Sequence, residues 1–168
     1  MKIILINGQS GTGKSSVAKA LMSGLKDSAH IEVDSLVATN PWEFGGKTDD
    51  LAIKNAVSLI HNFSKSGFDN IVVSGLTRNQ ILLDQFLEQL KHDAEIIFIW
   101  LRADKEIRKS RKLGRDRDDA DKQESFDVVD RVYPDIQSIE LKNGKSLFID
   151  TSSKSIPEVV EDIQTFLK

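Results

Sequence analysis

Residues 8–15 read Gly8-Gln9-Ser10-Gly11-Thr12-Gly13-Lys14-Ser15. They match in full the phosphate-binding pattern G-x-x-x-x-G-K-[ST]. A short apolar run, residues 2–7, precedes the motif, and residues 16–26 carry apolar side chains at helical spacing. The motif therefore lies between an expected strand and an expected helix. A glycine-rich turn that merely caps a helix is the alternative, but such a turn does not require Lys and Ser at these positions.

The residue types of this motif suit the binding of a phosphate chain. Its glycines permit backbone conformations that are closed to residues with a Cβ, so successive N–H groups can turn toward an anion, and the following helix adds its positive end. We expect Lys14 to reach the β- and γ-phosphates and the Ser15 hydroxyl to bind Mg²⁺. The expected nucleotide-binding residues of the loop are Gly8, Gln9, Ser10, Gly11, Thr12, Gly13, Lys14, Ser15 and Ser16.

Length and composition indicate a single domain over residues 1–168. The 39% of hydrophobic residues suffices for a core, and without cysteine there is no disulfide, thiolate metal site or Cys nucleophile. No apolar run approaches the ~20 residues of a membrane span, and the N-terminal run is too short for a signal peptide, so we expect a cytoplasmic protein with no membrane partner. A net charge of −3 predicts no nucleic-acid partner.

Apolar strand-like runs alternate with helical patterns along the chain. The expected strands lie near residues 2–7, 30–33, 70–74, 96–101 and 146–150. The expected helices cover residues 13–26, 49–66, 80–91, 105–113, 124–141 and 155–167, with a break at Pro134 and a capping box of Ser155 and Glu158. This order predicts an α/β fold with a parallel sheet covered on both faces. Ligands bind beyond the carboxyl ends of such strands, so the residues that follow each expected strand are candidates for the site.

Asp34 follows the second expected strand and is our candidate for the carboxylate that orients an acceptor hydroxyl and takes its proton. A helix cap or a surface position is the alternative for this residue. The irregular segment 40–46 carries Trp42, which is a candidate for lining an acceptor pocket or for filling the core.

Arginines follow the third and fourth expected strands. Arg78 is a candidate for pinning an anionic group of the acceptor or a transferring phosphate, with a surface role as the alternative. Residues 108–121 are densely charged and include six cations. We interpret this part of the chain as carrying a lid, near residues 113–123, that closes over phosphates. A solvated helix end is the alternative. The six cations are Arg108, Lys109, Arg111, Lys112, Arg115 and Arg117.

Beyond the loop, the chain resembles the small P-loop kinases related to nucleoside monophosphate kinases. The resemblance runs through Ser74-Gly75-Leu76-Thr77-Arg78, through Ser110-Arg111-Lys112-Leu113-Gly114-Arg115-Asp116-Arg117, and through Arg131-Val132-Tyr133. It implies that Arg111 and Arg115 stand on an arginine-bearing lid at the nucleotide, and that Arg131 points back at the phosphates. It also implies a three-layer P-loop NTPase fold with a five-stranded parallel sheet, ATP as phosphate donor and Mg²⁺.

Two departures from the pattern of that family concern the site. Nucleotide kinases have Asp-Gly-x-Pro-Arg where this chain has Ser74 and Thr77, so the acid beside the metal and the turn proline are both missing. The monophosphate-binding segment after the second strand is also absent. In its place, Val33-Asp34-Ser35-Leu36 is similar to the chloramphenicol phosphotransferase-like kinases, whose Asp acts as base toward a small-molecule hydroxyl. Gluconate and shikimate kinases share the general layout, so the resemblance favours a small hydroxylated acceptor.

The function that we expect is an ATP- and Mg²⁺-dependent phosphotransferase that moves the γ-phosphate of ATP to a hydroxyl of a small molecule. The resemblance implies that the adenine lies near residues 150–153. A nucleoside or nucleoside monophosphate kinase is the alternative among enzymes, and a nucleotide-binding regulator that hydrolyses slowly or not at all is the alternative outside them. We expect a small-molecule acceptor as the partner and a monomer or homodimer. The expected catalytic residues are Lys14, Asp34 and Arg115, and the expected acceptor contacts are Asp34, Trp42, Arg78 and Arg131.

Overall fold

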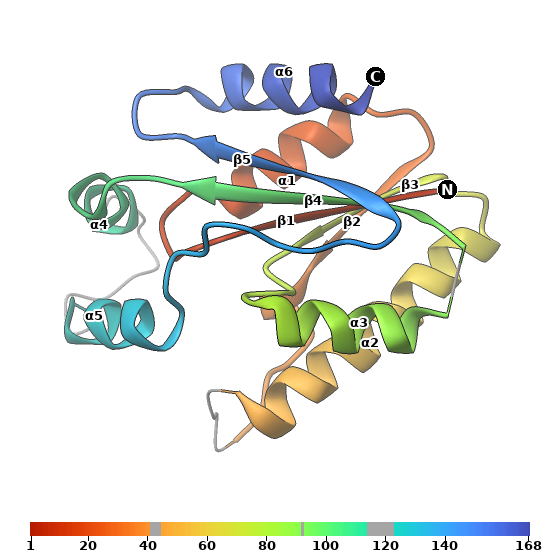
Figure 1. Ribbon diagram of the computed structural model, residues 1–168, viewed down its shortest axis with the longest axis horizontal. Coiled ribbons are helices and arrows are strands. Elements are labelled where there is room, and N and C mark those ends of the chain that lie inside the picture. The colour runs from red at the N-terminus through yellow and green to blue at the C-terminus, as the bar shows by residue number, and fades with distance from the viewer. Residues whose placement is uncertain (41–44, 92, 114–122) are drawn as a thin grey trace.

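The strands form one parallel five-stranded sheet in the order β2-β3-β1-β4-β5 (Figure 1). The computed structural model describes residues 1–40, 45–91, 93–113 and 123–168. Because β1 lies at the centre of the sheet, the loop that leaves its carboxyl end is flanked by the ends of β3 and β4. The strands are β1 (Lys2–Gly8), β2 (Ser28–Glu32), β3 (Asn70–Ser74), β4 (Glu95–Arg102) and β5 (Gly144–Asp150).

Helices cover both faces of the sheet and its carboxyl edge. In Figure 1, α1 and α6 lie on one side of the sheet, α2 and α3 on the other, and α4 and α5 beside the edge to which the strand arrows of β4 and β5 point. The alternation of expected strands and helices is confirmed. The helices are α1 (Lys14–Ser23), α2 (Gly46–Lys65), α3 (Gln80–Leu90), α4 (Lys105–Leu113), α5 (Gln123–Val132) and α6 (Ile156–Leu167), and the 3₁₀ turn η1 spans Val33–Ser35.

Two hydrophobic clusters sandwich the sheet. Successive side chains of a strand point to opposite faces, so Ile3 and Leu5 of β1 join the cluster under α2 and α3, whereas Ile4 and Ile6 join the cluster under α1 and α6. All four side chains are fully buried. Strands buried on both faces are typical of parallel sheets, and this explains why β1 reads as a continuous apolar run. The predicted α/β three-layer fold is thereby confirmed.

Two expected elements differ from the structure. The second strand ends at Glu32, so Asp34 belongs to η1 and does not directly follow the strand. The expected helix over residues 124–141 ends at Val132, and no second helix follows Pro134. Proline lacks an N–H group and disfavours helical geometry in the residue before it. Ile136, Ile139 and Leu141 instead pack as an irregular segment against the cluster under α2 and α3.

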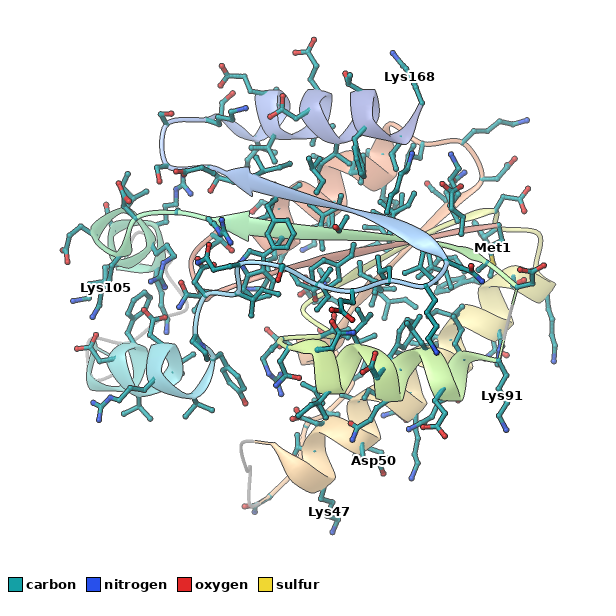
Figure 2. All side chains as sticks on the ribbon, in the orientation of Figure 1. Met1, Lys47, Asp50, Lys91, Lys105 and Lys168 are labelled. Carbon is teal, nitrogen blue, oxygen red and sulfur yellow. The ribbon has the colours of Figure 1, made fainter. Side chains whose placement is uncertain are left out.

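The outer surface is charged and polar. Figure 2 shows the side chains of Lys47, Asp50, Lys91, Lys105 and Lys168 projecting away from the sheet. Among the helices of the described ranges, none is both long enough and apolar enough to cross a bilayer. The capping box expected at the start of the last helix is confirmed, because Ser155 and Glu158 exchange hydrogen bonds there.

Candidate active site

The glycine-rich loop joins β1 to α1 at the centre of the carboxyl edge. Gly13 caps α1 in the left-handed conformation, with φ of 96°. Gly11 has φ of 85°, and a Cβ at this position would lie 2.5 Å from the carbonyl oxygen of Arg108. Both positions therefore favour glycine, because their φ angles are positive and, at Gly11, a Cβ would clash with the backbone of Arg108. The first amides of α1, which have no partner within the helix, face this loop as an anion-binding end.

Lys14 lies across the loop that carries it. Its ammonium nitrogen donates a hydrogen bond of 3.0 Å to the carbonyl oxygen of Gln9, and the hydroxyl of Thr12 donates to the same oxygen at 2.8 Å. These contacts fold the loop into a closed turn around Gln9. The structure thus brings Lys14 and the loop backbone together, and the reach of Lys14 to the β- and γ-phosphates stays a prediction.

A carboxylate that the sequence analysis missed stands beside Ser15. The hydroxyl of Ser15 donates to Oε1 of Glu32 at 3.0 Å, and the hydroxyl of Ser74 donates to the same oxygen at 3.1 Å. Glu32 ends β2 and is paired in register with Ser74 at the end of β3. We expected the acid beside the metal to be missing because Ser74 takes its place. Glu32 supplies a carboxylate at this place from the neighbouring strand.

His30 extends this chain of hydrogen bonds. Its Nε2 atom lies 2.9 Å from the hydroxyl oxygen of Ser74. Since the single hydroxyl proton of Ser74 goes to Glu32, Nε2 of His30 is the donor in this contact. Burial lowers the pKa of His30 below 6.5, against the opposing effect of the nearby Glu32 charge. A neutral imidazole with its proton on Nε2 is therefore the form that fits the contact at neutral pH.

Oxygen donors at Ser15 and Glu32 fit a divalent cation. Mg²⁺ is a hard ion that takes oxygen ligands, and it is held by one or two carboxylates together with substrate phosphates. The hydroxyl and the carboxylate are already adjacent at the loop, where a phosphate chain would complete the shell. The donors present therefore fit Mg²⁺ beside a phosphate chain.

Asp34 lines a pocket of about 240 Å³ between η1, α2 and the end of β3. Its carboxylate is exposed, as expected for a group that meets a ligand. Gly75 lines the same pocket, and a Cβ at Gly75 would lie 4.0 Å from Cε of Lys14. The pocket of Asp34 is thus next to the side chain of Lys14. Trp42, the other residue expected here, lies outside the described residues.

Arg78 lies in the same pocket but has partners of its own. Its guanidinium pairs with the carboxylate of Asp49 on α2, and these side chains are only 24% and 17% exposed. The guanidinium also lies over the ring of Tyr133, 4.0 Å from the ring centroid. Burial raises the pKa of Tyr133, with the charge of Arg78 acting in the opposite direction, so the phenol keeps its proton at neutral pH.

Arg108, one of the six cations of residues 108–121, is a buried structural residue. It is 3% exposed and holds Asp130 of α5 through two hydrogen bonds of 2.8 and 2.7 Å. It also donates to the carbonyl oxygen of Ser10 at 3.2 Å. Arg108 precedes the expected lid at residues 113–123, and its side chain ties α4 and α5 to the phosphate-binding loop. Arg115 and Arg117 lie outside the described residues, so their place on a lid stays a prediction.

Arg111 points to the loop that follows β5. It donates to the hydroxyl of Thr151 at 3.0 Å and to its carbonyl oxygen at 2.6 Å. Arg111 and Thr151 line a pocket of about 310 Å³ together with Thr12, Gly13 and Ser16 of the phosphate-binding loop. The structure therefore joins the two segments that were expected to meet an adenine nucleotide. Arg131 lies on α5 with an exposed side chain, and its expected contact with the phosphates stays a prediction.

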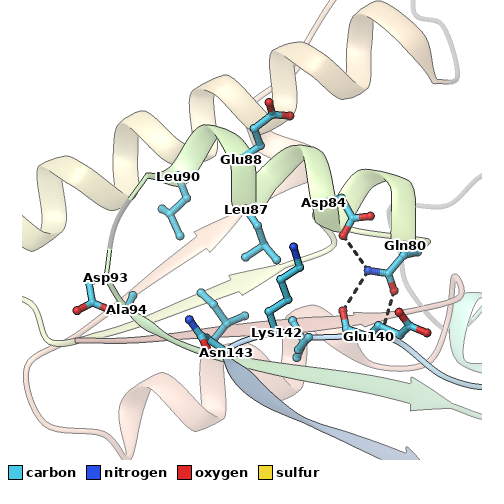
Figure 3. A pocket seen from close by; sticks show the side chains of 12 residues that line it. Gln80, Asp84, Leu87, Glu88, Leu90, Asp93, Ala94, Glu140, Lys142 and Asn143 are labelled. Atoms are coloured by element: carbon cyan, nitrogen blue, oxygen red, sulfur yellow. Dashed lines mark hydrogen bonds between the residues drawn. The ribbon is translucent and has the colours of Figure 1, made fainter.

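A larger pocket of about 650 Å³ contains none of this chemistry. It lies between α3 and the segment that leads into β5, and no residue of the glycine-rich loop lines it (Figure 3). The amide of Gln80 bridges its rim by donating to Asp84 at 2.8 Å and to the carbonyl oxygen of Glu140 at 3.1 Å. Size alone therefore does not identify the candidate active site.

The sequence matches a family model described as an AAA domain over residues 4–130. The chain belongs to this family. No curated protein sequence matches it. The matched range includes the glycine-rich loop, Glu32, Asp34 and the helix of Arg111, so the family covers most of the candidate site.

Solved structures share the whole fold at low sequence identity. A gluconokinase from Sinorhizobium meliloti 1021 aligns with a TM-score of 0.72 and 17% identity over 99% of this chain and 91% of that one. A sugar kinase from Janibacter sp. HTCC2649 aligns with a TM-score of 0.70 and 16% identity over 99% of this chain and 94% of that one. The APS kinase of Mycobacterium tuberculosis, solved with AMPPNP and APS, aligns with a TM-score of 0.69 and 16% identity over 99% of this chain and 96% of that one. The P-loop kinase fold is thereby confirmed.

Proposed function

We propose that this protein is an ATP- and Mg²⁺-dependent kinase that transfers the γ-phosphoryl group of ATP to a hydroxyl of a small molecule. The observation that carries the proposal is the position of Asp34. Its exposed carboxylate lines the pocket that adjoins Lys14 across Gly75. A site that held only a nucleotide would need no carboxylate in a separate pocket beside the phosphates.

The nucleotide side of the proposal rests on the loop and on Arg111. The triphosphate would lie along residues 8–16, and the adenine would occupy the 310 Å³ pocket that Arg111 and Thr151 line. Aligned structures include a gluconokinase and an APS kinase, and the latter contains AMPPNP. These likenesses support a kinase with an adenine nucleotide as its phosphate donor.

Ser15 and Glu32 would hold the metal. When bound there, Mg²⁺ neutralises negative charge on the β- and γ-phosphates. The hydrogen bonds from Ser15 and Ser74 keep the Glu32 carboxylate turned toward the loop. Ligand orientation by such outer contacts is worth about 10- to 100-fold in metal affinity or activity.

Asp34 and Lys14 have different roles in the proposed reaction. Asp34 accepts a hydrogen bond from the acceptor hydroxyl and takes its proton as the hydroxyl oxygen bonds to the γ-phosphorus. The bond from the γ-phosphorus to the bridging oxygen breaks, and ADP keeps that bond pair. Lys14 stabilises the charge that spreads over the phosphoryl oxygens. Catalysis on this scheme consists of positioning and charge stabilisation.

The regulator alternative loses its main argument. It depended on the absence of an acid beside the metal at Ser74, and Glu32 supplies that carboxylate. The arrangement of Ser15, Glu32 and Asp34 has one donor set for a metal and a second carboxylate for an acceptor, which a nucleotide sensor does not need.

The substitution Asp34→Asn tests the proposal. It retains size and most hydrogen bonding but removes the proton acceptor, so we expect transfer to fall by about 10²- to 10⁴-fold while the affinity for Mg²⁺-ATP stays unchanged. Asp50→Asn is the matched control, because Asp50 is an exposed carboxylate of α2 that pairs with Lys54 one turn away. Wild-type transfer rates in Asp34→Asn would remove Asp34 from the mechanism.

A further inference from the structure

The charges around the acceptor pocket are already balanced within the protein. Arg78 is the one cation among the pocket-lining residues that the structure describes, and Asp34 and Asp49 are the anions there. The Asp49 carboxylate pairs with the Arg78 guanidinium, which leaves Asp34 as the carboxylate without a cation in this lining. Among its described lining residues, the pocket therefore offers an acceptor a negative group and no cation that lacks a carboxylate partner, and Lys14 lies at its border across Gly75.

The Arg78–Asp49 pair is costly to open. Both side chains are more than three-quarters buried, so removing Arg78 would leave the Asp49 carboxylate short of water and without its cation. The Tyr133 ring holds the other side of the guanidinium at 4.0 Å. An anionic acceptor would compete with Asp49 for this guanidinium and would also lie beside Asp34 and the triphosphate. Both effects act against a carboxylate or phosphate in the pocket.

The remaining groups of the pocket suit hydroxyls. Thr48 and Tyr133 line it and can each donate and accept a hydrogen bond, and Asp34 accepts. The volume of about 240 Å³ lies below the ~300–1,000 Å³ of pockets for drug-sized ligands. A ligand of about the size of a monosaccharide fits this space.

We propose that the acceptor is an uncharged polyhydroxylated molecule of about monosaccharide size, and that the Arg78–Asp49 pair excludes sugar acids and sugar phosphates from the site. This inference rests on the proposed kinase function, and it names the substrate class of the same pocket. The specificity-determining residue is Asp49, because its carboxylate holds Nη2 of the cation that would otherwise recognise an anionic group, whereas Nε of Arg78 is buried and has no hydrogen-bond partner within the described residues.

Matched acceptors test the inference by transfer. Glucose is compared with gluconate, and ribose with ribose 5-phosphate, in wild type, Asp49→Asn and the control Asp50→Asn. We expect wild type to prefer the uncharged member of a pair by about tenfold or more in kcat/KM, the effect of one charge-assisted hydrogen bond. In Asp49→Asn, Arg78 is released and the ratio should move toward the acid by about the same factor. Asp50→Asn should keep the wild-type ratio. A wild-type preference for the acids would overturn the inference.

Binding measured without transfer separates the two proposals. Glucose and gluconate are titrated into ¹⁵N-labelled protein held with Mg²⁺-AMPPNP, and chemical shifts at Arg78 and Tyr133 are followed. Gluconate binding that appears only in Asp49→Asn supports the inference even if no acceptor is ever phosphorylated, in which case the kinase proposal alone fails. If wild type binds gluconate as tightly as it binds glucose, or if Asp49→Asn gains no affinity for gluconate, the inference fails whatever the transfer assay shows.

Discussion

Ser15 in the phosphate-binding loop and Glu32 at the end of β2 are joined by a hydrogen bond of 3.0 Å. They are separated by α1 in the sequence and meet because β2 and β1 both flank β3. The residue of β3 between them is Ser74, whose hydroxyl donates to the same Glu32 oxygen. A serine thus stands at the end of the strand next to the loop, and the carboxylate comes from one strand further out.

Glu32→Gln should weaken the response to Mg²⁺. The amide keeps the size of the side chain but loses the charge, so we expect the Mg²⁺ concentration for half-maximal activity to rise by about 10- to 100-fold. A Mg²⁺ titration at fixed ATP measures this shift. Glu95→Gln serves as control, because Glu95 lies at the amino end of β4 next to Lys2 and Lys145. An unchanged Mg²⁺ requirement in Glu32→Gln would exclude Glu32 from the metal site.

Lys14→Ala should abolish transfer and weaken nucleotide binding, because it removes the cation that the loop motif aims at the phosphates. Isothermal titration calorimetry with ATP and Mg²⁺ measures the loss. Lys19→Ala, on the exposed part of α1, should bind as wild type does. If wild-type protein gives no heat with millimolar ATP, the nucleotide-binding claim itself is refuted.

Asp130→Asn should destabilise the fold. Asp130 and Arg108 form an ion pair with side chains only 14% and 4% exposed, and breaking a buried pair costs about 3–5 kcal/mol because one charge loses its partner. Urea unfolding gives the change in free energy. The exposed pair of Asp50 and Lys54 provides the comparison, where Asp50→Asn should cost less than about 1 kcal/mol. Equal losses in the two variants would contradict a structural role for Arg108.

The sequence predicts the elements of the fold well because their signals are local. The apolar runs, the loop motif and the Ser155–Glu158 capping box each lie within a few residues, and the structure confirms them. Residues 133–141 show the limit of such signals. Their apolar spacing suits a helix, but Pro134 ends the helix and the apolar side chains pack onto the sheet as an irregular segment.

Site residues within one continuous segment could be predicted from the sequence. Site residues that come together only through the order of the strands could not. Residues 8–16 follow from the motif alone. Glu32 was overlooked because its role depends on the order β2-β3-β1, which local patterns do not specify. The signal that the sequence offered was a second carboxylate, Glu32, two residues before Asp34 at the end of the same expected strand. The partnership of Arg78 with Asp49 joins α2 to the end of β3 and likewise depends on tertiary packing.

Transfer of label from γ-³²P-ATP tests the central claim most directly. Wild-type protein with Mg²⁺ is incubated with separate pools of uncharged polyols, sugar acids, aminoglycosides, chloramphenicol-like alcohols and nucleotides, and products are separated from inorganic phosphate. The account predicts label on a hydroxyl of a compound in the polyol pool, no label with Lys14→Ala, and about 10²- to 10⁴-fold less with Asp34→Asn. Label that appears only as inorganic phosphate with every pool would contradict it.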